Sequence, residues 1–243
     1  MVEATIEPPD VETASERYAR RFAGRVGAWF LEVQARTTLE LLRPWPSARV
    51  LEVGGGHGQL TGALVEAGHD VTVYASPGAT AERLRPWTDS GRVRLHHGDL
   101  LRAPWPDRAF DVVLSFRLVA HVPRWRELLA ELSRLAARAV IVDYPTARSV
   151  NAAASRLFGL KKAIEGDTRR FAVLRDADVR AALLAQGLSV TARRPQFLLP
   201  MALHRALRLL PVARSLEAAA RTAGLTRAWG SPVIVRAERD ARA

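Results

Sequence analysis

The 243-residue chain contains no cysteine. This excludes disulfide frameworks, thiolate zinc sites, iron–sulfur clusters and catalytic thiolate nucleophiles, and the chain suits either redox environment. Lysine is scarce as well, because 34 of the 36 basic residues are arginine. No apolar run approaches the roughly 18 residues that a membrane-spanning helix needs. The first residues are acidic where a secretion signal would be basic, so we expect a soluble, cytoplasmic protein.

Charge is unevenly distributed along the chain. The formal net charge is +11, yet residues 1–143 carry 18 basic and 18 acidic side chains. The excess lies in residues 144–243, which carry 18 basic side chains against 7 acidic ones. Three interpretations fit this excess: a solvated arginine-rich surface, a basic cover over an anionic small molecule, or a surface for nucleic acid. We favour the first and rank nucleic acid last.

Short β-type runs alternate with helical patterns along most of the chain. The predicted strands are residues 49–53, 71–74, 92–96, 110–115, 139–143, 188–194 and 231–236. Near-continuous Val, Ile and Leu in several of them is typical of strands that are buried on both faces. We therefore predict an α/β fold, a doubly wound, seven-stranded, mostly parallel sheet with helices on both faces and a helical insert between the last two strands.

The pattern predicts one domain rather than several. Residues 1–14 are acidic and contain consecutive prolines, so we expect a mobile N-terminal arm. The domain then occupies residues 15–243, and residues 15–46 form its N-terminal helical cover. Residues 146–171 and 198–229 are the candidate elements that cover a substrate, because long excursions between strands are usually functional.

The strongest local motif joins the strand at 49–53 to the helix that follows. It reads Glu52-Val53-Gly54-Gly55-Gly56-His57-Gly58-Gln59. Glycines in such a turn let the backbone bend sharply and let a ligand approach main-chain N–H groups without meeting a Cβ atom. The dinucleotide-binding pattern requires a third glycine where Gln59 stands, so the turn departs from that pattern.

This turn, with Glu52 two residues before its first glycine, resembles motif I of the class I S-adenosylmethionine-dependent methyltransferases. The later motifs follow in the family's order: Gly98-Asp99-Leu100 resembles the adenine-binding segment, and residues 110–116 resemble the fourth strand. Residues 139–144 are similar to the fifth strand. The resemblance covers residues 15–145 and implies the family's Rossmann-like fold, methyl transfer as the activity and S-adenosylmethionine as the cofactor.

The resemblance also implies which residues bind the cofactor. Glu52 would hold the amino group of its methionine part, Asp99 would accept from the adenine amino group, and the next N–H would meet the ring. The fourth strand would pass beside the methionine part. The expected cofactor-binding residues are Glu52, Gly54, Gly55, Gly56, Gly58, Ala75, Ser76, Asp99, Leu100, Ser115 and Phe116.

One departure from the family concerns the end of the second strand. The family carries an acid there, whose carboxylate takes both ribose hydroxyls, whereas this sequence has Tyr74 or Ala75. Losing such a charge-assisted contact weakens binding by about 1.5–3 kcal/mol unless Ser76 or backbone groups substitute. A catalytically inactive partner protein with this fold is therefore an alternative.

Two residues are catalytic candidates. His121 is the expected general base, since the loop after the fourth strand faces the methyl group in the family. Tyr144, just past the fifth strand, is expected to orient the acceptor. Packing roles remain open for both. The histidines have no metal-ligand spacing, and His96 and His97 point to opposite faces of a strand, so we predict no metal site.

These observations favour methyl transfer to oxygen or nitrogen, in preference to carbon, of a small molecule, with an anionic acceptor suited to the basic C-terminal part. Ser115-Phe116-Arg117-Leu118 replaces the Asn/Asp-Pro-Pro-aromatic signature of DNA amine methyltransferases, which argues against base methylation. An RNA-binding or RNA-modifying methyltransferase that uses the basic region is the alternative. The acceptor, the use of a general base and the oligomeric state stay open.

Overall fold

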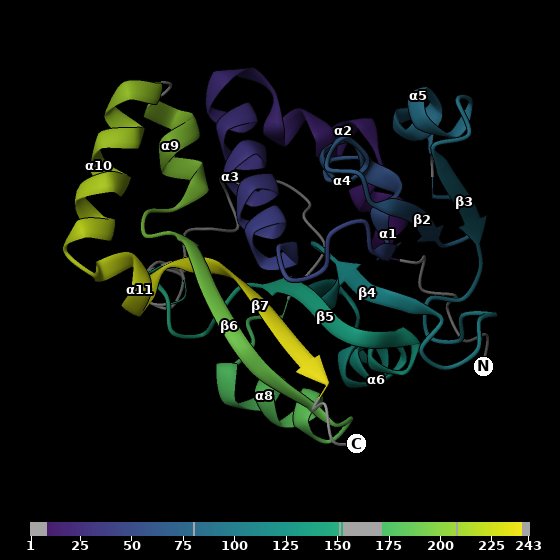
Figure 1. Cartoon of the computed structure of the whole chain (residues 1–243). Helices are drawn as coiled ribbons and strands as arrows, with labels where there is room; N and C mark the ends of the chain where they lie inside the picture. The colour runs from purple at the N-terminus through teal and green to yellow at the C-terminus, as the bar shows by residue number, and fades with distance from the viewer. Residues whose placement is uncertain (1–8, 80, 151, 153–171, 208, 240–243) are drawn as a thin grey trace, which may run out of the picture.

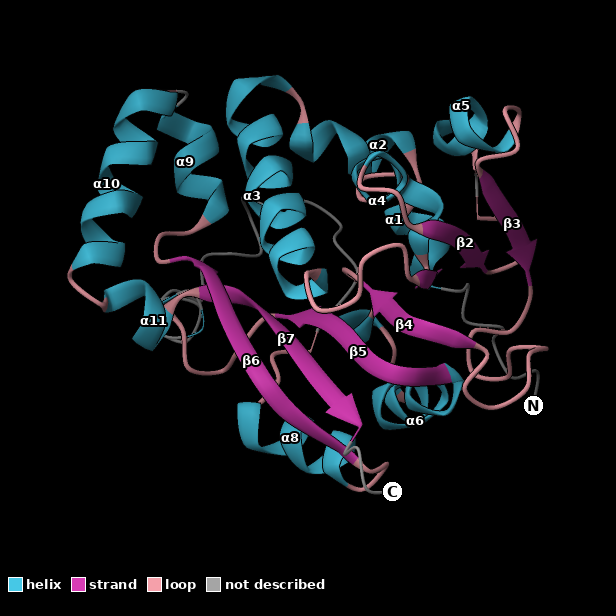
Figure 2. Cartoon of the chain, in the orientation of Figure 1, coloured by secondary structure: helices cyan, strands magenta, loops and turns pink. Residues whose placement is uncertain are grey.

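A seven-stranded sheet in the order β3-β2-β1-β4-β5-β7-β6 forms the centre of the molecule (Figures 1 and 2). The computed structural model describes residues 9–239, apart from residues 80, 151, 153–171 and 208. Every neighbouring pair is parallel except the two that β7 makes with β5 and β6. The predicted seven-stranded, mostly parallel sheet is therefore confirmed.

The strands form where the apolar runs predicted them. Their bounds are β1 Arg49–Val53, β2 Asp70–Ala75, β3 Val93–His97, β4 Phe110–Ser115, β5 Ala136–Tyr144, β6 Leu188–Phe197 and β7 Ser231–Arg239. At the centre, Val50 pairs with Val71 on one side and with Val112 on the other, and all three are fully buried. Burial on both faces explains why these strands read as continuous hydrophobic runs.

Helices cover both faces of the sheet. The α-helices are α1 Pro9–Thr13, α2 Glu16–Ala19, α3 Gly24–Leu42, α4 Thr61–Glu66, α5 Arg85–Thr88, α6 Trp125–Leu135, α8 Asp176–Leu184, α9 Met201–Leu207, α10 Leu210–Thr222 and α11 Leu225–Trp229. The short 3-10 helices are η1 Arg20–Phe22, η2 Gly55–His57, η3 Glu82–Leu84 and η4 Val119–His121. No helix among the described residues has the length and apolar character needed to cross a bilayer.

The alternation of side chains along β5 divides the core into two layers. Val140, Val142 and Tyr144 lie in the cluster that α6 and α8 cover with apolar side chains such as Leu128. Ile141 instead lies in the cluster on the opposite face, under α3 and α4. Because successive side chains of a strand point to opposite faces, Asp143 belongs to the α3 side and Tyr144 to the α6 side.

The mobile arm predicted for residues 1–14 is wrong from residue 9 onward. Residues 9–13 form α1, which lies beside β2 and η2, and Asp10, Thr13 and Ala14 are buried. Ala14 packs against Ala75 and Ala79 at the end of β2. The composition suggested mobility, but this apolar contact and the buried carboxylate of Asp10 hold the segment in place.

The insert between β6 and β7 is fixed to α3 by a buried aromatic and polar cluster. His204 in α9 is fully buried, with the rings of Trp29 and Phe30 centred 5.7 and 5.9 Å from its own. Its Nε2 lies 2.9 Å from Oε1 of Glu217 in α10. Glu217 also accepts the two N–H groups that follow β6. That this insert covers an acceptor stays a prediction; most of the other predicted cover, 146–171, lies outside the described residues.

Candidate active site

The glycine-rich turn after β1 forms at the carboxyl edge of the sheet, beside the point where the strand order reverses between β1 and β4. Ligands of doubly wound folds bind at such points. Gly54 and Gly58 bracket η2 with φ of 75° and 63°, a left-handed conformation that strongly favours glycine. The Gly54 N–H donates to the Tyr74 carbonyl of β2 over 2.8 Å, so the turn is fixed to the neighbouring strand.

Glu52 places a carboxylate beneath this turn. Its side chain is 1 % exposed, and its Oε2 accepts a hydrogen bond of 2.6 Å from the Thr61 hydroxyl. Burial raises the pKa of Glu52 to about 7, and the Thr61 hydrogen bond lowers it in part. A Cβ atom on Gly55 would stand 2.6 Å from the Glu52 Cδ atom, so glycine at that position leaves room for the carboxylate.

His57 is buried inside the turn as a neutral imidazole. Burial, with repulsion from Arg117, lowers the pKa of His57 to about 3. Its Nδ1 accepts the Gln59 N–H over 3.2 Å, so that nitrogen carries no proton. The ring therefore contributes shape and hydrogen-bonding capacity to the site rather than a positive charge.

The segment after β3 places the predicted adenine-binding residues at the rim of the site. Leu100 is buried, whereas Asp99 is exposed and its Oδ1 accepts the Leu101 N–H over 2.9 Å. The Tyr74 hydroxyl donates to the Asp99 carbonyl over 3.2 Å. Tyr74 thus fixes the segment from β2, and the contact between Asp99 and adenine stays a prediction.

Ser115 and Phe116 end β4 with both side chains turned into the protein. The Ser115 hydroxyl donates to the Val53 carbonyl over 3.1 Å, which ties β4 to β1 beside the turn. Phe116 is buried in the core cluster on the α3 face. Any contribution of these two residues to a ligand would therefore come from their backbone.

Arg117, the next residue, is the centre of a polar cluster that the sequence did not predict. It adopts φ of 58°, uncommon for a residue with a side chain, and its N–H donates to Oδ1 of Asp143 at the end of β5 over 2.5 Å. Its guanidinium donates to the side-chain oxygen Oε1 of Gln34 in α3, and the guanidinium carbon lies 4.0 Å from the centre of the Phe22 ring. Tyr18 of α2 is 8 % exposed and interacts electrostatically with the charges of Arg117 and Asp143.

Asp143 supplies a second perturbed carboxyl at this edge. It is 5 % exposed, and burial raises its pKa to about 6, while the Arg117 N–H and charge lower it in part. The sequence did not single out this carboxyl as a proton acceptor. The signal was present, because an acid at the carboxyl end of a parallel strand is a recurrent functional position.

The structure places the two catalytic candidates differently. His121 is half-buried in η4, four residues after Arg117, and its place at the carboxyl edge agrees with the expected loop. Tyr144 lies on the other face of β5 from Asp143, and its hydroxyl donates to Oδ1 of Asp176 over 3.2 Å. The structure therefore does not bring Tyr144 together with Arg117 and Asp143, and its proposed contact with the acceptor stays untested.

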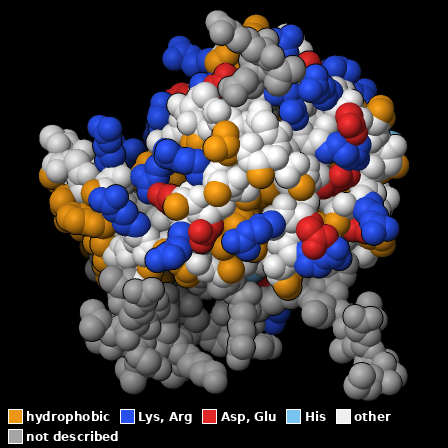
Figure 3. Space-filling view, turned by 90° about the horizontal axis from the view of Figure 1, so that it is seen from below, with side chains coloured by type: hydrophobic (Ala, Val, Ile, Leu, Met, Phe, Trp, Pro, Cys, Tyr) orange, Lys and Arg blue, Asp and Glu red, His pale blue; other side chains and the backbone are white. Residues whose placement is uncertain are grey.

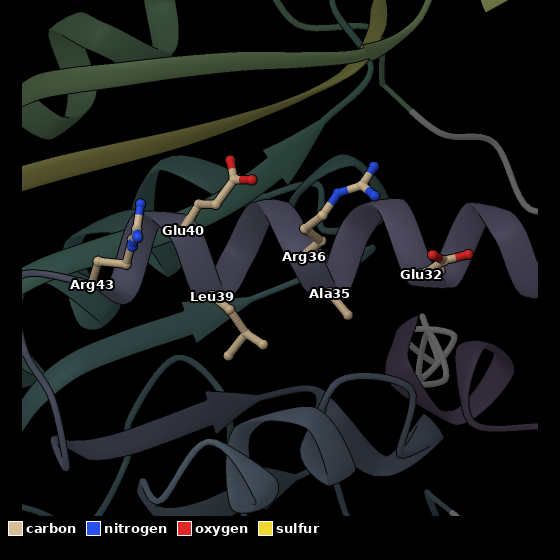
Figure 4. A pocket seen from close by; sticks show the side chains of 6 residues that line it. All are labelled: Glu32, Ala35, Arg36, Leu39, Glu40 and Arg43. Atoms are coloured by element: carbon tan, nitrogen blue, oxygen red, sulfur yellow. The ribbon is translucent and has the colours of Figure 1, made fainter. Parts of the chain in front are cut away.

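A separate groove of about 400 Å³ lies along α3 (Figure 4). Its lining residues are Glu32, Ala35, Arg36, Leu39, Glu40 and Arg43. None of the predicted site residues lines it, and its two acids and two arginines mark a solvated helix surface. Among the described residues, no group of three or more acids and histidines is placed to hold a metal ion.

Six buried side-chain atoms near the turn and the Arg117 cluster have no hydrogen-bond partner among the described residues. They are Asp10 Oδ1, Gln34 Nε2, Glu52 Oε1, His57 Nε2, Gln59 Oε1 and Arg117 Nη1. Each unpaired buried polar atom costs about 1–3 kcal/mol, so such a concentration indicates a site that a polar ligand completes. The set includes carboxylate oxygens around the turn and, in the Arg117 cluster, an amide donor and a guanidinium, so the two places suit bound groups of opposite charge.

Comparison with known proteins identifies the family of the central part of the chain. Residues 51–142, from within β1 to within β5, match a family model described as a methyltransferase domain. These residues form a class I methyltransferase domain. The domain uses S-adenosylmethionine.

Solved structures show the same fold over nearly the whole chain. The magnesium protoporphyrin IX methyltransferase of Synechocystis PCC 6803, with bound SAH, is 16% identical with a TM-score of 0.64, covering 93% of this chain and 94% of its own. A putative methyltransferase in complex with the Haloferax volcanii Trm112 activator is 16% identical with a TM-score of 0.64, covering 97% and 99%. A possible histamine N-methyltransferase of Thermotoga maritima is 15% identical with a TM-score of 0.57, covering 93% and 94%. The shared fold therefore extends beyond residues 51–142 to nearly the whole chain.

Proposed function

We propose that this methyltransferase acts on oxygen or nitrogen of a small, anionic acceptor that binds beside Arg117 and Asp143. The observation that carries the proposal is the Arg117 guanidinium, whose buried Nη1 is unpaired, beside the Asp143 carboxyl that the Arg117 N–H contacts and whose pKa burial raises to about 6. Guanidinium groups favour carboxylates and other planar anions. A negatively charged acceptor would complete the hydrogen bonding of Arg117.

The burial of this cluster supports a small acceptor. Tyr18, Gln34 and Asp143 are each less than 10 % exposed, and they come from the N-terminal helices and from β5. A small molecule can be enclosed among them, whereas a folded RNA would have to extrude its target nucleotide into the same space. Enclosure also excludes water, which strengthens the electrostatic contacts inside the site.

Methyl transfer requires little chemistry from the protein. S-adenosylmethionine supplies an electrophilic methyl group on a positively charged sulfur. The chain has to hold the acceptor in line and, for a hydroxyl or ammonium acceptor, remove its proton. We assign orientation of the acceptor to Arg117 and proton removal to Asp143, with His121 as the second candidate base.

Several of the described arginines in the basic C-terminal part of the chain are engaged within the fold. Arg193 pairs with Asp176 at 2.9 Å, and Arg236 pairs with Glu238 at 2.8 Å. Arg239 donates to the Ser133 carbonyl over 2.6 Å. On the face shown in Figure 3, acidic side chains stand among the basic ones. This distribution favours a solvated, ion-paired surface over the continuous basic stripe that binds nucleic acid.

Incubation with labelled S-adenosylmethionine tests the acceptor class. We expect label to enter a low-molecular-weight, anion-exchange-retained fraction of a metabolite extract, and total RNA to stay unlabelled. Arg117→Met should raise the KM for that acceptor at least about tenfold, since a charged hydrogen bond contributes 1.5–3 kcal/mol. The dissociation constant of S-adenosylhomocysteine should hardly change. Labelling of RNA would contradict the proposal. So would an Arg117→Met variant that loses affinity for S-adenosylhomocysteine but keeps its KM for the acceptor.

Asp143→Asn tests the proton acceptor. Asparagine keeps an oxygen for the Arg117 N–H but cannot take a proton, so we expect kcat to fall by about a hundredfold or more. In the parent enzyme the rate should rise with pH through about 6, because Asp143 must be ionised to act, and the variant should lack that rise. His121→Gln is the matched variant. If the rise survives in Asp143→Asn and is lost in His121→Gln, the base is His121.

A further inference from the structure

The end of β2 is the place where this domain departs from a typical nucleoside site. Ala75 ends the strand with no exposed surface, and Ser76 follows it, 3 % exposed. Neither side chain carries a charge. In doubly wound folds an acid near the end of the second strand accepts hydrogen bonds from the ribose hydroxyls of a bound nucleotide. The strand itself therefore supplies no group for a vicinal diol.

A carboxylate reaches this place from the other end of the sequence. The Ser76 N–H donates to Oδ2 of Asp10 in α1 over 2.7 Å. Asp10 is 0 % exposed, although α1 lies near the start of the described chain. Burial of a carboxylate is costly unless its oxygens are hydrogen-bonded, so a single N–H partner does not account for this arrangement.

The second oxygen of Asp10 is the unexplained atom. Oδ1 is buried and has no hydrogen-bond partner among the described residues. It belongs to the same set of unpaired atoms as Glu52 Oε1 and Gln59 Oε1 around the glycine turn. An ionised carboxylate only accepts hydrogen bonds, so a ligand that meets Oδ1 has to present a hydroxyl or amine donor.

The segment that carries Asp10 is held against the turn at several points. Helix α1 contacts η2, and Ala14 packs against Ala75 and Ala79. After α1, Glu16 pairs with Arg83 at 2.8 Å, and Arg83 lies next to Gly58 of the turn. These contacts place the Asp10 carboxylate between the end of β2 and the glycine turn, the region where a nucleoside bound at the turn would extend.

We propose that Asp10 accepts the ribose hydroxyls of S-adenosylmethionine and replaces the acid that β2 lacks. The carboxylate is fixed by the Ser76 N–H through Oδ2 and receives the sugar through Oδ1. The N-terminal segment is then part of the cofactor site, and its closure over the turn contributes directly to cofactor affinity. This role concerns the methyl donor and does not depend on which acceptor the enzyme uses.

Calorimetric binding of S-adenosylhomocysteine and its 2′-deoxy and 3′-deoxy analogues tests this role. Asp10→Ala should weaken binding of S-adenosylhomocysteine about ten- to hundredfold, the range of a hydrogen bond to a charged group. The same variant should bind at least one deoxy analogue as tightly as the parent protein does. The loss should therefore depend on a particular hydroxyl, which a merely structural role would not produce.

Two further variants keep the test decisive. Asp10→Asn retains an oxygen for the Ser76 N–H without the charge, so α1 should stay in place. The ratio of affinities between S-adenosylhomocysteine and its deoxy analogues should nevertheless fall. Glu12→Ala removes a less buried carboxylate from the same helix and should leave all three dissociation constants unchanged. Equal losses for all three ligands in Asp10→Ala would show that the carboxylate only seats α1. Unchanged binding of S-adenosylhomocysteine would also overturn the proposal.

Discussion

Glu52→Gln is expected to stabilise the ligand-free protein at alkaline pH while it weakens cofactor binding. The pKa of Glu52 is raised to about 7 by burial, whereas a glutamate in an unfolded chain titrates near 4.3. The folded state therefore binds more protons than the unfolded state between these values, and stability falls as pH rises through 7. From pH 5 to pH 8 this fall amounts to about 2–3 kcal/mol, which glutamine abolishes.

Thermal unfolding at pH 5 and pH 8 measures this effect. In a domain of this size, about 2–3 kcal/mol corresponds to about 4–12 °C in Tm, so the variant should gain that much at pH 8 relative to pH 5. Its affinity for S-adenosylhomocysteine should fall about ten- to hundredfold, because the ligand's ammonium group loses a charged partner. Glu66→Gln, an exposed acid on α4, is the control for the change in net charge. A variant whose stability follows pH as the parent's does would show that Glu52 does not titrate near 7.

The sheet and the glycine turn could be predicted because their signals are local. The central strands β1, β2, β4 and β5 contain short runs of apolar residues, and the turn is a contiguous motif in which Gly54 and Gly58 supply the positive φ angles. Glu52 could be identified for the same reason, since it precedes the turn by two residues. In these places propensity, hydrophobic pattern and the resemblance to a family pointed to one answer.

Asp10 and Arg117 could not be predicted because their roles depend on contacts between distant segments. Asp10 meets Ser76 across 66 positions of sequence, and composition alone assigned its segment to a mobile arm. Arg117 reads as one more arginine of an arginine-rich chain until α3 and β5 enclose it. Tyr144 shows a different limit. Adjacent residues of a strand point to opposite faces, so the β5 side chain that lies on the α3 side is that of Asp143, one residue before Tyr144.

Gly55→Ala is expected to disrupt the site more than any other single methyl addition in the turn. The new Cβ would stand 2.6 Å from both Cγ and Cδ of Glu52, closer than such atoms approach one another. The side chain of Glu52 is enclosed by β1 and Thr61, so it cannot move aside without leaving its place below the turn. Affinity for S-adenosylhomocysteine, measured by calorimetry, should fall about a hundredfold, or roughly 2.7 kcal/mol.

Gly62→Ala is the matched control, because its Cβ would also meet a side chain at 2.6 Å, that of Trp87. It should cost about 1–3 kcal/mol of stability through overpacking while leaving the affinity nearly unchanged. If Gly55 serves to accommodate Glu52, the two positions are coupled. Gly55→Ala should then cost far less affinity for S-adenosylhomocysteine in a Glu52→Ala variant than in the parent protein. Additive losses in the double variant would contradict that explanation. They would mean that the turn needs glycine at position 55 for its own backbone rather than for the buried carboxylate beneath it.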